Sequence, residues 1–197
     1  MNTLKAEKRS MDVKAKKLRR EGYVTGNLFG REIEGSIPLK FTKKEIEVLL
    51  KNNNKGSQVM LELDGETYDA LIKEVDYNPL VHAVEEVDFQ ALVSNEMVHS
   101  TAEIILENEE KVISGVLQDE LKEVAYKAFP ADLVDKIKVD VAGMKIGDTL
   151  RVKDLEIAKN KNIHITTDLE AVIATVTAVH NVVPETDADT EETAEEK

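Results

Sequence analysis

The sequence predicts a mainly β protein with short helices, divided into two β domains. Three observations predict this class. Apolar and polar residues alternate with a period of two in several separate segments. The pair Asp64-Gly65 stands between two such segments, which is a strong short-range pattern for a β-hairpin. The expected strands are short and recur roughly every 8–12 residues, which favours a barrel or a sandwich in each half of the chain.

The first half contains the clearest elements. Residues 36–41 alternate apolar and polar side chains and predict a strand. Thr42 to Glu45 matches a capping box, and apolar residues at helical spacing follow it, so we expect a helix over 43–52. After the helix we expect the two arms of the Asp64-Gly65 hairpin, then a turn at Asn78-Pro79 and a further strand. These three strands are expected over 59–63, 68–75 and 84–93.

The second half repeats the β character without repeating the sequence. The stretch 171–179 is nearly all apolar or Thr, which predicts a strand buried on both faces. The stretch 116–128 fits neither the helical nor the strand period cleanly, so both remain open. Further strands are expected over 97–106 and 111–118, which flank a turn at 108–110, and over 136–141 and 163–166.

These patterns divide the chain into three parts. We place a boundary near Ser94-Asn95, which gives a first domain over 1–94 and a second over 95–183. Residues 184–197 contain no large apolar side chain and many acids. Such a segment cannot bury enough surface to offset its ordering entropy, so we expect a disordered acidic tail.

The net charge of the chain is −13, which by itself argues against a nucleic-acid partner. The charge is unevenly distributed, however. Residues 1–20 carry eight basic and two acidic side chains, whereas residues 185–197 carry seven acids and one Lys. Because charges more than about 8 Å apart are screened at physiological salt, the basic N-terminal segment can act independently of the acidic remainder.

Composition and spacing exclude most kinds of chemistry. The absence of Cys removes disulfides, thiol nucleophiles and thiolate metal sites. The four His residues show no metal-binding spacing, and no glycine-rich phosphate loop or serine nucleophile motif occurs. No apolar run approaches 18 residues, and the N-terminus lacks the apolar stretch of a signal peptide. We therefore expect a cytoplasmic protein that is not an enzyme, with no cofactor, metal, membrane or small-molecule partner.

The basic N-terminal segment favours contact with folded RNA. Five cationic side chains lie within residues 14–20, and Gly22, Gly26 and Gly30 follow at four-residue intervals with Tyr23 and Phe29 between them. Cations neutralise the phosphates of RNA, and planar rings contact its riboses or bases. We interpret the glycines as breaks in the chain that allow the backbone to approach RNA closely. The alternative is that this basic segment is only a solvent-exposed surface with no RNA partner.

A family resemblance adds to this pattern. The run KLRREG at 17–22, followed by Val24 and by LFG at 28–30, resembles the bacterial large-subunit ribosomal proteins of the L-twenty-five/CTC (general stress) family. The segments LIKEVDYNP at 71–79 and VDF at 87–89 are similar to the signature of that family's RNA-binding domain. The stretch 129–157 is similar to the C-terminal domain of the family's long form, and the acidic tail also suits that form. The resemblance extends from Ala6 to about Val179.

The resemblance implies a fold and a partner. It implies a six-stranded β-barrel-like domain that docks on an internal loop of 5S rRNA in the central protuberance, and a second, mainly β domain without catalysis. The barrel is expected to be similar to the anticodon-binding domain of glutaminyl-tRNA synthetase. The implied partners are 5S rRNA and proteins of the large subunit, and the implied location is the cytoplasmic ribosome, with a link to the general stress response.

The resemblance also implies RNA-binding positions. Phe29 keeps a ring but lacks a hydroxyl donor, and Lys14 and Lys16 keep the basic character of the loop. The full set of implied RNA-binding residues is Arg9, Lys14, Lys16, Lys17, Arg19, Arg20, Phe29, Gly30 and Asp88.

Two positions depart from the family pattern. Asp76 stands where the family often has Gln, and Glu86 stands where it usually has His. Both place carboxylates where a neutral or cationic group would face RNA. Each repulsive or lost contact costs about 1 kcal/mol or more. Together the two carboxylates therefore predict that the affinity for 5S rRNA is weakened well over tenfold. An alternative hypothesis follows, in which the chain is a diverged paralogue that serves as a stress-related protein-interaction module.

Overall fold

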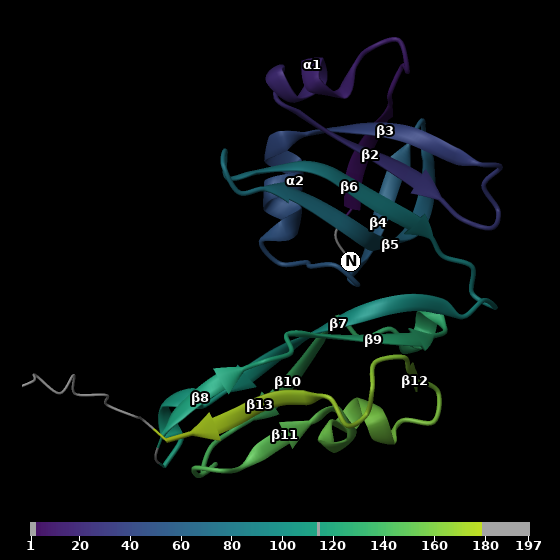
Figure 1. The fold of residues 1–197 in the computed structure, drawn as a ribbon. Coiled ribbons are helices and arrows are strands. Elements are labelled where there is room, and N and C mark those ends of the chain that lie inside the picture. Colours follow the sequence, from purple (N-terminus) through teal and green to yellow (C-terminus); the bar gives the residue numbers. More distant parts are fainter. Residues whose placement is uncertain (1–2, 114, 179–197) are drawn as a thin grey trace, which may run out of the picture.

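The computed structural model describes residues 3–113 and 115–178 and confirms a mainly β class. The first six strands form a closed barrel in the order β1-β3-β2-β6-β5-β4 (Figure 1). Parallel pairing of β1 with β4 closes the barrel, and β2 also pairs in parallel with β6. The six-stranded barrel implied by the resemblance is therefore confirmed. The strands are β1 (Thr3–Lys8), β2 (Tyr23–Phe29), β3 (Ser36–Thr42), β4 (Gln58–Leu63), β5 (Glu66–Asn78) and β6 (Ala83–Ala91).

Alternating apolar residues fill the interior of this barrel. Val59, Leu61 and Leu63 of β4 are buried while the residues between them are partly exposed, as the period of a strand requires. The rings of Phe41 and Phe89 meet in the core with their centroids 5.4 Å apart. The barrel thus encloses one continuous hydrophobic core.

The predicted hairpin joins β4 to β5. Asp64 and Gly65 both have positive φ angles, of 53° and 87°, which the tight turns of two-residue hairpins require. Leu63 pairs with Glu66 directly beyond the turn. β5 is longer than the sequence predicted, since it continues to Asn78.

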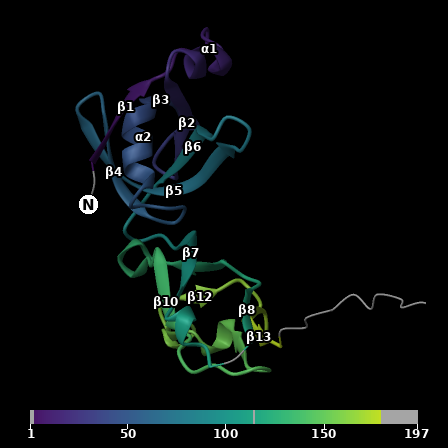
Figure 2. The same ribbon diagram turned by 90° about the vertical axis from the view of Figure 1, so that its left-hand side faces the viewer.

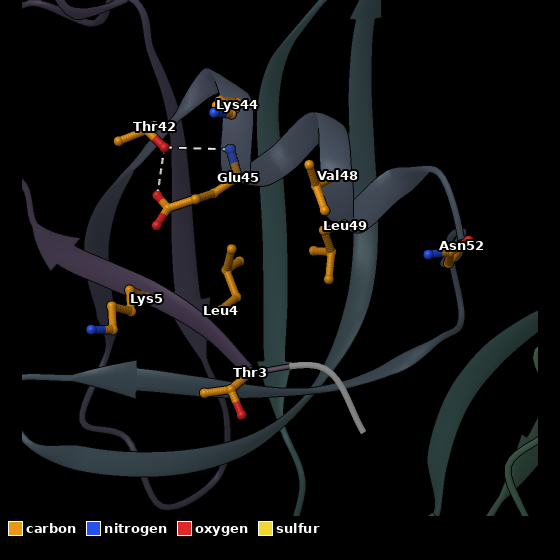
Figure 3. A pocket seen from close by; sticks show the side chains of 9 residues that line it. All are labelled: Thr3, Leu4, Lys5, Thr42, Lys44, Glu45, Val48, Leu49 and Asn52. Carbon is orange, nitrogen blue, oxygen red and sulfur yellow. Dashed lines mark hydrogen bonds between the residues drawn. The ribbon is translucent and has the colours of Figure 1, made fainter.

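Two short α-helices belong to the first domain within the described residues: α1 (Ala15–Arg20) and α2 (Lys43–Leu50). At the start of α2, the hydroxyl of Thr42 accepts a hydrogen bond from the backbone N–H of Glu45 (Figure 3). The predicted helix is confirmed, although it ends two residues earlier than expected. Ile46 and Leu49 of α2 pack into the barrel core.

Two strands of the barrel were missed by the residue patterns. β1 buries Leu4 and Ala6 alternately, but charged residues surround them. The interpretation of the glycines as chain breaks is wrong at Gly26, which lies inside β2. A Cβ atom at Gly26 would stand 2.0 Å from the carbonyl oxygen of Val87, so this glycine allows β2 and β6 to approach each other.

The second domain contains two sheets within the described residues. One has the order β10-β7-β9-β12 and the other β11-β13-β8. The alternatives for 116–128 are settled in favour of strands, since β8 and β9 lie there. The bounds are β7 (Val98–Glu107), β8 (Val116–Asp119), β9 (Glu123–Ala128), β10 (Lys136–Asp140), β11 (Thr149–Arg151), β12 (His164–Ile165) and β13 (Val172–Thr177), with 3₁₀ turns η1 (Glu109–Lys111), η2 (Pro130–Asp132), η3 (Val152–Asp154) and η4 (Glu156–Lys159).

The pairing of these strands is not sequential. The strand predicted over 111–118 is shorter than expected, because β8 begins only at Val116. Asn108 in the predicted turn has a φ of 62°, yet β8 pairs with β13, and β7 pairs with β9 and β10. In β13 the successive residues Ile173 and Ala174 are both buried, so the middle of this strand is covered on both faces as predicted.

The two β regions contact each other beside the connection between β6 and β7. The predicted boundary at Ser94-Asn95 falls within this connection. The hydroxyl of Ser57 donates to the carboxylate of Asp135 at 3.3 Å, and the ammonium of Lys73 donates to the carbonyl oxygen of His99 at 2.8 Å. Helix α1 lies at the end of the barrel remote from the second domain (Figures 1 and 2). The predicted acidic tail, 184–197, lies outside the described residues.

In the described ranges, no helix is both long enough and apolar enough to cross a membrane.

Candidate RNA-binding interface

The outer face of β2 and β6, together with α1, brings most of the predicted RNA-binding residues together. Leu28 and Phe89 are paired in register and point into the core. Since side chains alternate along a strand, their neighbours Phe29 and Asp88 project outward. We call the outer face of β2 and β6 the β2–β6 strip.

Helix α1 presents three cations to solvent. Its apolar residue Leu18 is buried and fixes the helix on the barrel. Lys16, Lys17 and Arg20 are exposed. Lys17 has a carboxylate within reach, that of Glu21 at 3.8 Å, but this pair is exposed and contributes little. The cations are therefore available for a partner with negative charge.

Arg19 behaves differently from its neighbours. Its guanidinium lies 3.0 Å from the carboxylate of Glu85 and 3.4 Å from that of Glu86, and its Nε donates to the backbone carbonyl of Glu85 at 3.1 Å. These contacts connect α1 to β6. Arg19 therefore acts first as a structural link, and its charge is already balanced within the chain.

A further polar contact organises the middle of the strip. Oδ1 of Asp88 accepts hydrogen bonds from the backbone N–H and the side-chain amide of Asn27, both at 3.0 Å. The same amide donates to Glu86 at 3.3 Å. Within the described residues Oδ2 of Asp88 has no hydrogen-bond donor, so it can accept one from a ligand. Sequence reasoning missed Asn27, because only the recognition of β2 as a strand would have placed it beside β6.

The two departures from the family pattern have different surroundings. The Glu86 carboxylate faces Arg19 and Asn27, and because it shares the Arg19 cation with Glu85, its charge is partly offset. Asp76 is exposed and is the register partner of Glu86, and the described part of the chain provides no ion pair for it. The predicted repulsion toward RNA therefore concentrates on Asp76.

The remaining predicted residues lie around this centre. The guanidinium of Arg9 donates to the carbonyl of Val13 at 3.1 Å and closes the loop before α1, while its Nε is buried with no partner among the described residues. Lys14 is exposed at the start of α1. Gly30 faces Ala91, whose Cβ would lie 2.9 Å from a Cβ at Gly30. Gly30 thus packs against β6 and offers a ligand only its backbone.

A groove on another side of the barrel contains none of the predicted residues. It has a volume of about 790 Å³ and lies between β1 and α2, with Leu4 and Leu49 among its lining residues (Figure 3). Its lining mixes apolar side chains with Lys5, Lys44 and Glu45. It has no constellation of groups that indicates catalysis.

Comparison with known proteins assigns a family to this architecture. The ribosomal L25p family model matches residues 4–89, and the model of the ribosomal protein TL5 C-terminal domain matches residues 97–180. The chain is similar to proteins named large ribosomal subunit protein bL25. It is 31% identical over 188 residues to that of Carboxydothermus hydrogenoformans, covering 91% of this chain and 93% of the relative. It is 28% identical to that of Caldanaerobacter subterraneus, covering 98% of each. The chain therefore belongs to the ribosomal L25p family.

Proposed function

We propose that this chain is a structural protein of the large ribosomal subunit that binds 5S rRNA through α1 and the β2–β6 strip. Its relatives are named as large-subunit proteins. The observation that carries the RNA assignment is the link from Arg19 to Glu85 and Glu86. Because this link holds α1 against β6, the exposed cations of the helix lie beside the polar strip and form one surface with it.

Each part of the surface has a distinct role toward RNA. Lys16, Lys17 and Arg20 neutralise phosphates, which gives affinity without sequence information. The ring of Phe29 contacts a base or ribose, and Oδ2 of Asp88 accepts a hydrogen bond from an amino group of a base. The backbone of Gly30 permits close approach at the end of the strip. This combination suits the irregular shape of an RNA internal loop.

A titration with a salt series tests the proposal. With about five phosphates neutralised, log K should fall against log[salt] with a slope near −3 to −5 for a 5S rRNA loop fragment. The double variant Lys16→Gln/Arg20→Gln should weaken binding and reduce the slope by about two. The control Lys44→Gln/Lys51→Gln on and after α2 has the same change in net charge and should bind as the wild type does. Binding that is undetectable at micromolar protein, or independent of salt, contradicts the proposal.

A second candidate function is a diverged stress-related protein-interaction module. The exposed Asp76 beside Glu86 favours it, since carboxylates repel phosphates. Sucrose-gradient fractionation of cells in growth and under stress separates the two functions. A ribosomal protein sediments with the large subunit, whereas the module remains in the unsedimented pool and rises in amount under stress.

A further inference from the structure

The second domain carries a row of basic side chains that the 5S rRNA assignment does not use. His99 of β7 is the register partner of Lys127 in β9, and Lys127 is the register partner of His164 in β12. Register partners project to the same side of a sheet, and all three side chains are exposed. With strands about 4.8 Å apart, the row is about 10 Å long. We call these three residues the basic row.

Two lysines of the barrel extend the basic row. The Lys73 ammonium donates to the carbonyl of His99 at 2.8 Å. Burial lowers the pKa of Lys73, and the nearby Lys55 lowers it further, while Glu74 opposes this change. The pKa of His99 is also lowered, by burial and then by Lys127 and Lys73. The cations are therefore close enough to disfavour one another's charge.

These cations lack anionic partners in a chain that is rich in acids. The chain has 39 acidic and 26 basic residues. Ion pairs occupy many of the other lysines and arginines, but within 3–113 and 115–178 none includes Lys55, Lys73, Lys127 or either histidine of the row. Clustered cations that form no ion pair are costly, and an external anion relieves the part of that cost that Glu74 does not already offset at Lys73.

A small cavity opens beside the row. It has a volume of about 230 Å³ between the barrel and the second domain, and its polar lining residues include Lys55, Lys73, His99 and Ser100 together with one carboxylate, that of Glu74. Ser100 is only 5% exposed, and its hydroxyl has no hydrogen-bond partner among the described residues. An unpaired buried hydroxyl costs stability unless a ligand or water completes it. The cavity thus combines two ammonium groups and an imidazole with a buried hydroxyl, and they outnumber its single carboxylate.

We propose that the basic row and this cavity bind the phosphate backbone of RNA, as a second RNA contact separate from α1 and the β2–β6 strip. The choice of RNA rests on the function proposed above. A phosphate accepts charge-assisted hydrogen bonds from ammonium groups and ordinary ones from imidazole N–H and hydroxyl groups, which are the donors present. A line of cations suits a polyanion with regularly repeated charges. α1 lies at the end of the barrel remote from the second domain (Figure 1). The basic row and the surface of α1 with the β2–β6 strip would therefore bind separate stretches of RNA.

The test is an NMR titration of the full chain at low salt with a short RNA duplex that lacks the 5S loop. The ring signals of His99 and His164 should shift, and the pKa of His99 should rise when phosphate approaches it, since an anion favours the imidazolium. Inorganic phosphate should shift the same signals at higher concentration. In Lys73→Gln/Lys127→Gln the affinity for the duplex should fall and its salt slope should decrease by about two.

A matched control and three contrary results make the test decisive. Lys111→Gln/Lys145→Gln removes the same charge at the far end of β7, roughly 26 Å along the strand from His99, and should leave the shifts intact. The proposal is wrong if the duplex gives no shift at millimolar concentration, or if the Lys73/Lys127 variant responds as the wild type does. It is also wrong if a synthetic peptide of residues 184–197 shifts the row as strongly as RNA, because the surface then binds acidic protein segments. The titration of the α1 variants with the 5S loop tests the proposed function separately, because those variants leave the basic row unchanged. Its outcome therefore does not decide whether the basic row binds RNA.

Discussion

Arg19 shows at the scale of one residue that a basic sequence and a basic surface are different things. The segment at 14–20 has five cations, and the sequence treats them alike. The structure assigns Arg19 to two carboxylates that lie 66 and 67 positions further along the chain. Composition identified the basic segment, but no local pattern reveals a partner so distant in sequence.

The same reasoning separates the two unusual carboxylates. Asp76→Asn removes an exposed negative charge that has no partner in the described structure, so we expect RNA to bind several-fold more tightly. Glu86→Gln should give a smaller gain, because Arg19 already offsets part of the charge of Glu86. Titration of both variants with the 5S loop fragment at one salt concentration checks this order. Equal gains would show that the Arg19 contact does not persist in solution.

At the scale of elements, one kind of predictable strand has branched or large apolar residues at every second position. β3, β4 and β10 follow this pattern and were predicted. β2 was missed because glycine is normally unfavourable within a strand. Glycine is required at position 26 because β6 approaches β2 closely there. The contacting residue, Val87, lies more than 60 residues further along the chain.

Gly26→Ala tests the pairing of β2 with β6. The added Cβ would stand 2.0 Å from the Val87 carbonyl, so the two strands must separate. We expect the free energy of unfolding to fall by about 2 kcal/mol or more, as overpacking at a buried site does. Urea unfolding followed by circular dichroism measures this, with Ser36→Ala at the exposed start of β3 as the control. A stability equal to that of the control contradicts the role of Gly26.

For the whole molecule, Gly56 decides how closely the barrel approaches the second domain. A Cβ at this position would lie 1.9 Å from the carbonyl oxygen of Thr101. The side-chain amide of Asn54, which donates to Glu103, lies in the same segment. The sequence predicted two domains, but the contact between them depends on the close backbone approach at Gly56 and on side-chain partners such as Ser57 and Asp135, which no residue pattern identifies.

Gly56→Ala should loosen this contact, and Gly65→Ala is its matched control. Both glycines have left-handed φ angles, of 89° and 87°, so the backbone strain of the two variants is similar. A Cβ at Gly65 meets nothing within 4 Å, whereas one at Gly56 meets Thr101. Limited proteolysis within 92–97 should be faster in Gly56→Ala alone. Equal cleavage of the two variants would mean that strain, not contact, governs the connection.

The parallel closure of the barrel determines when its surface first exists during synthesis. β1 emerges first, but its partner β4 follows about 50 residues later, and β2 must await β6. Such long-range pairings form slowly and only after the intervening chain is complete. Arg19 likewise leaves the translating ribosome long before Glu85 and Glu86 do. A nascent chain therefore exposes the cations of α1 without the strip beside them, and the complete surface appears only once residue 91 has emerged.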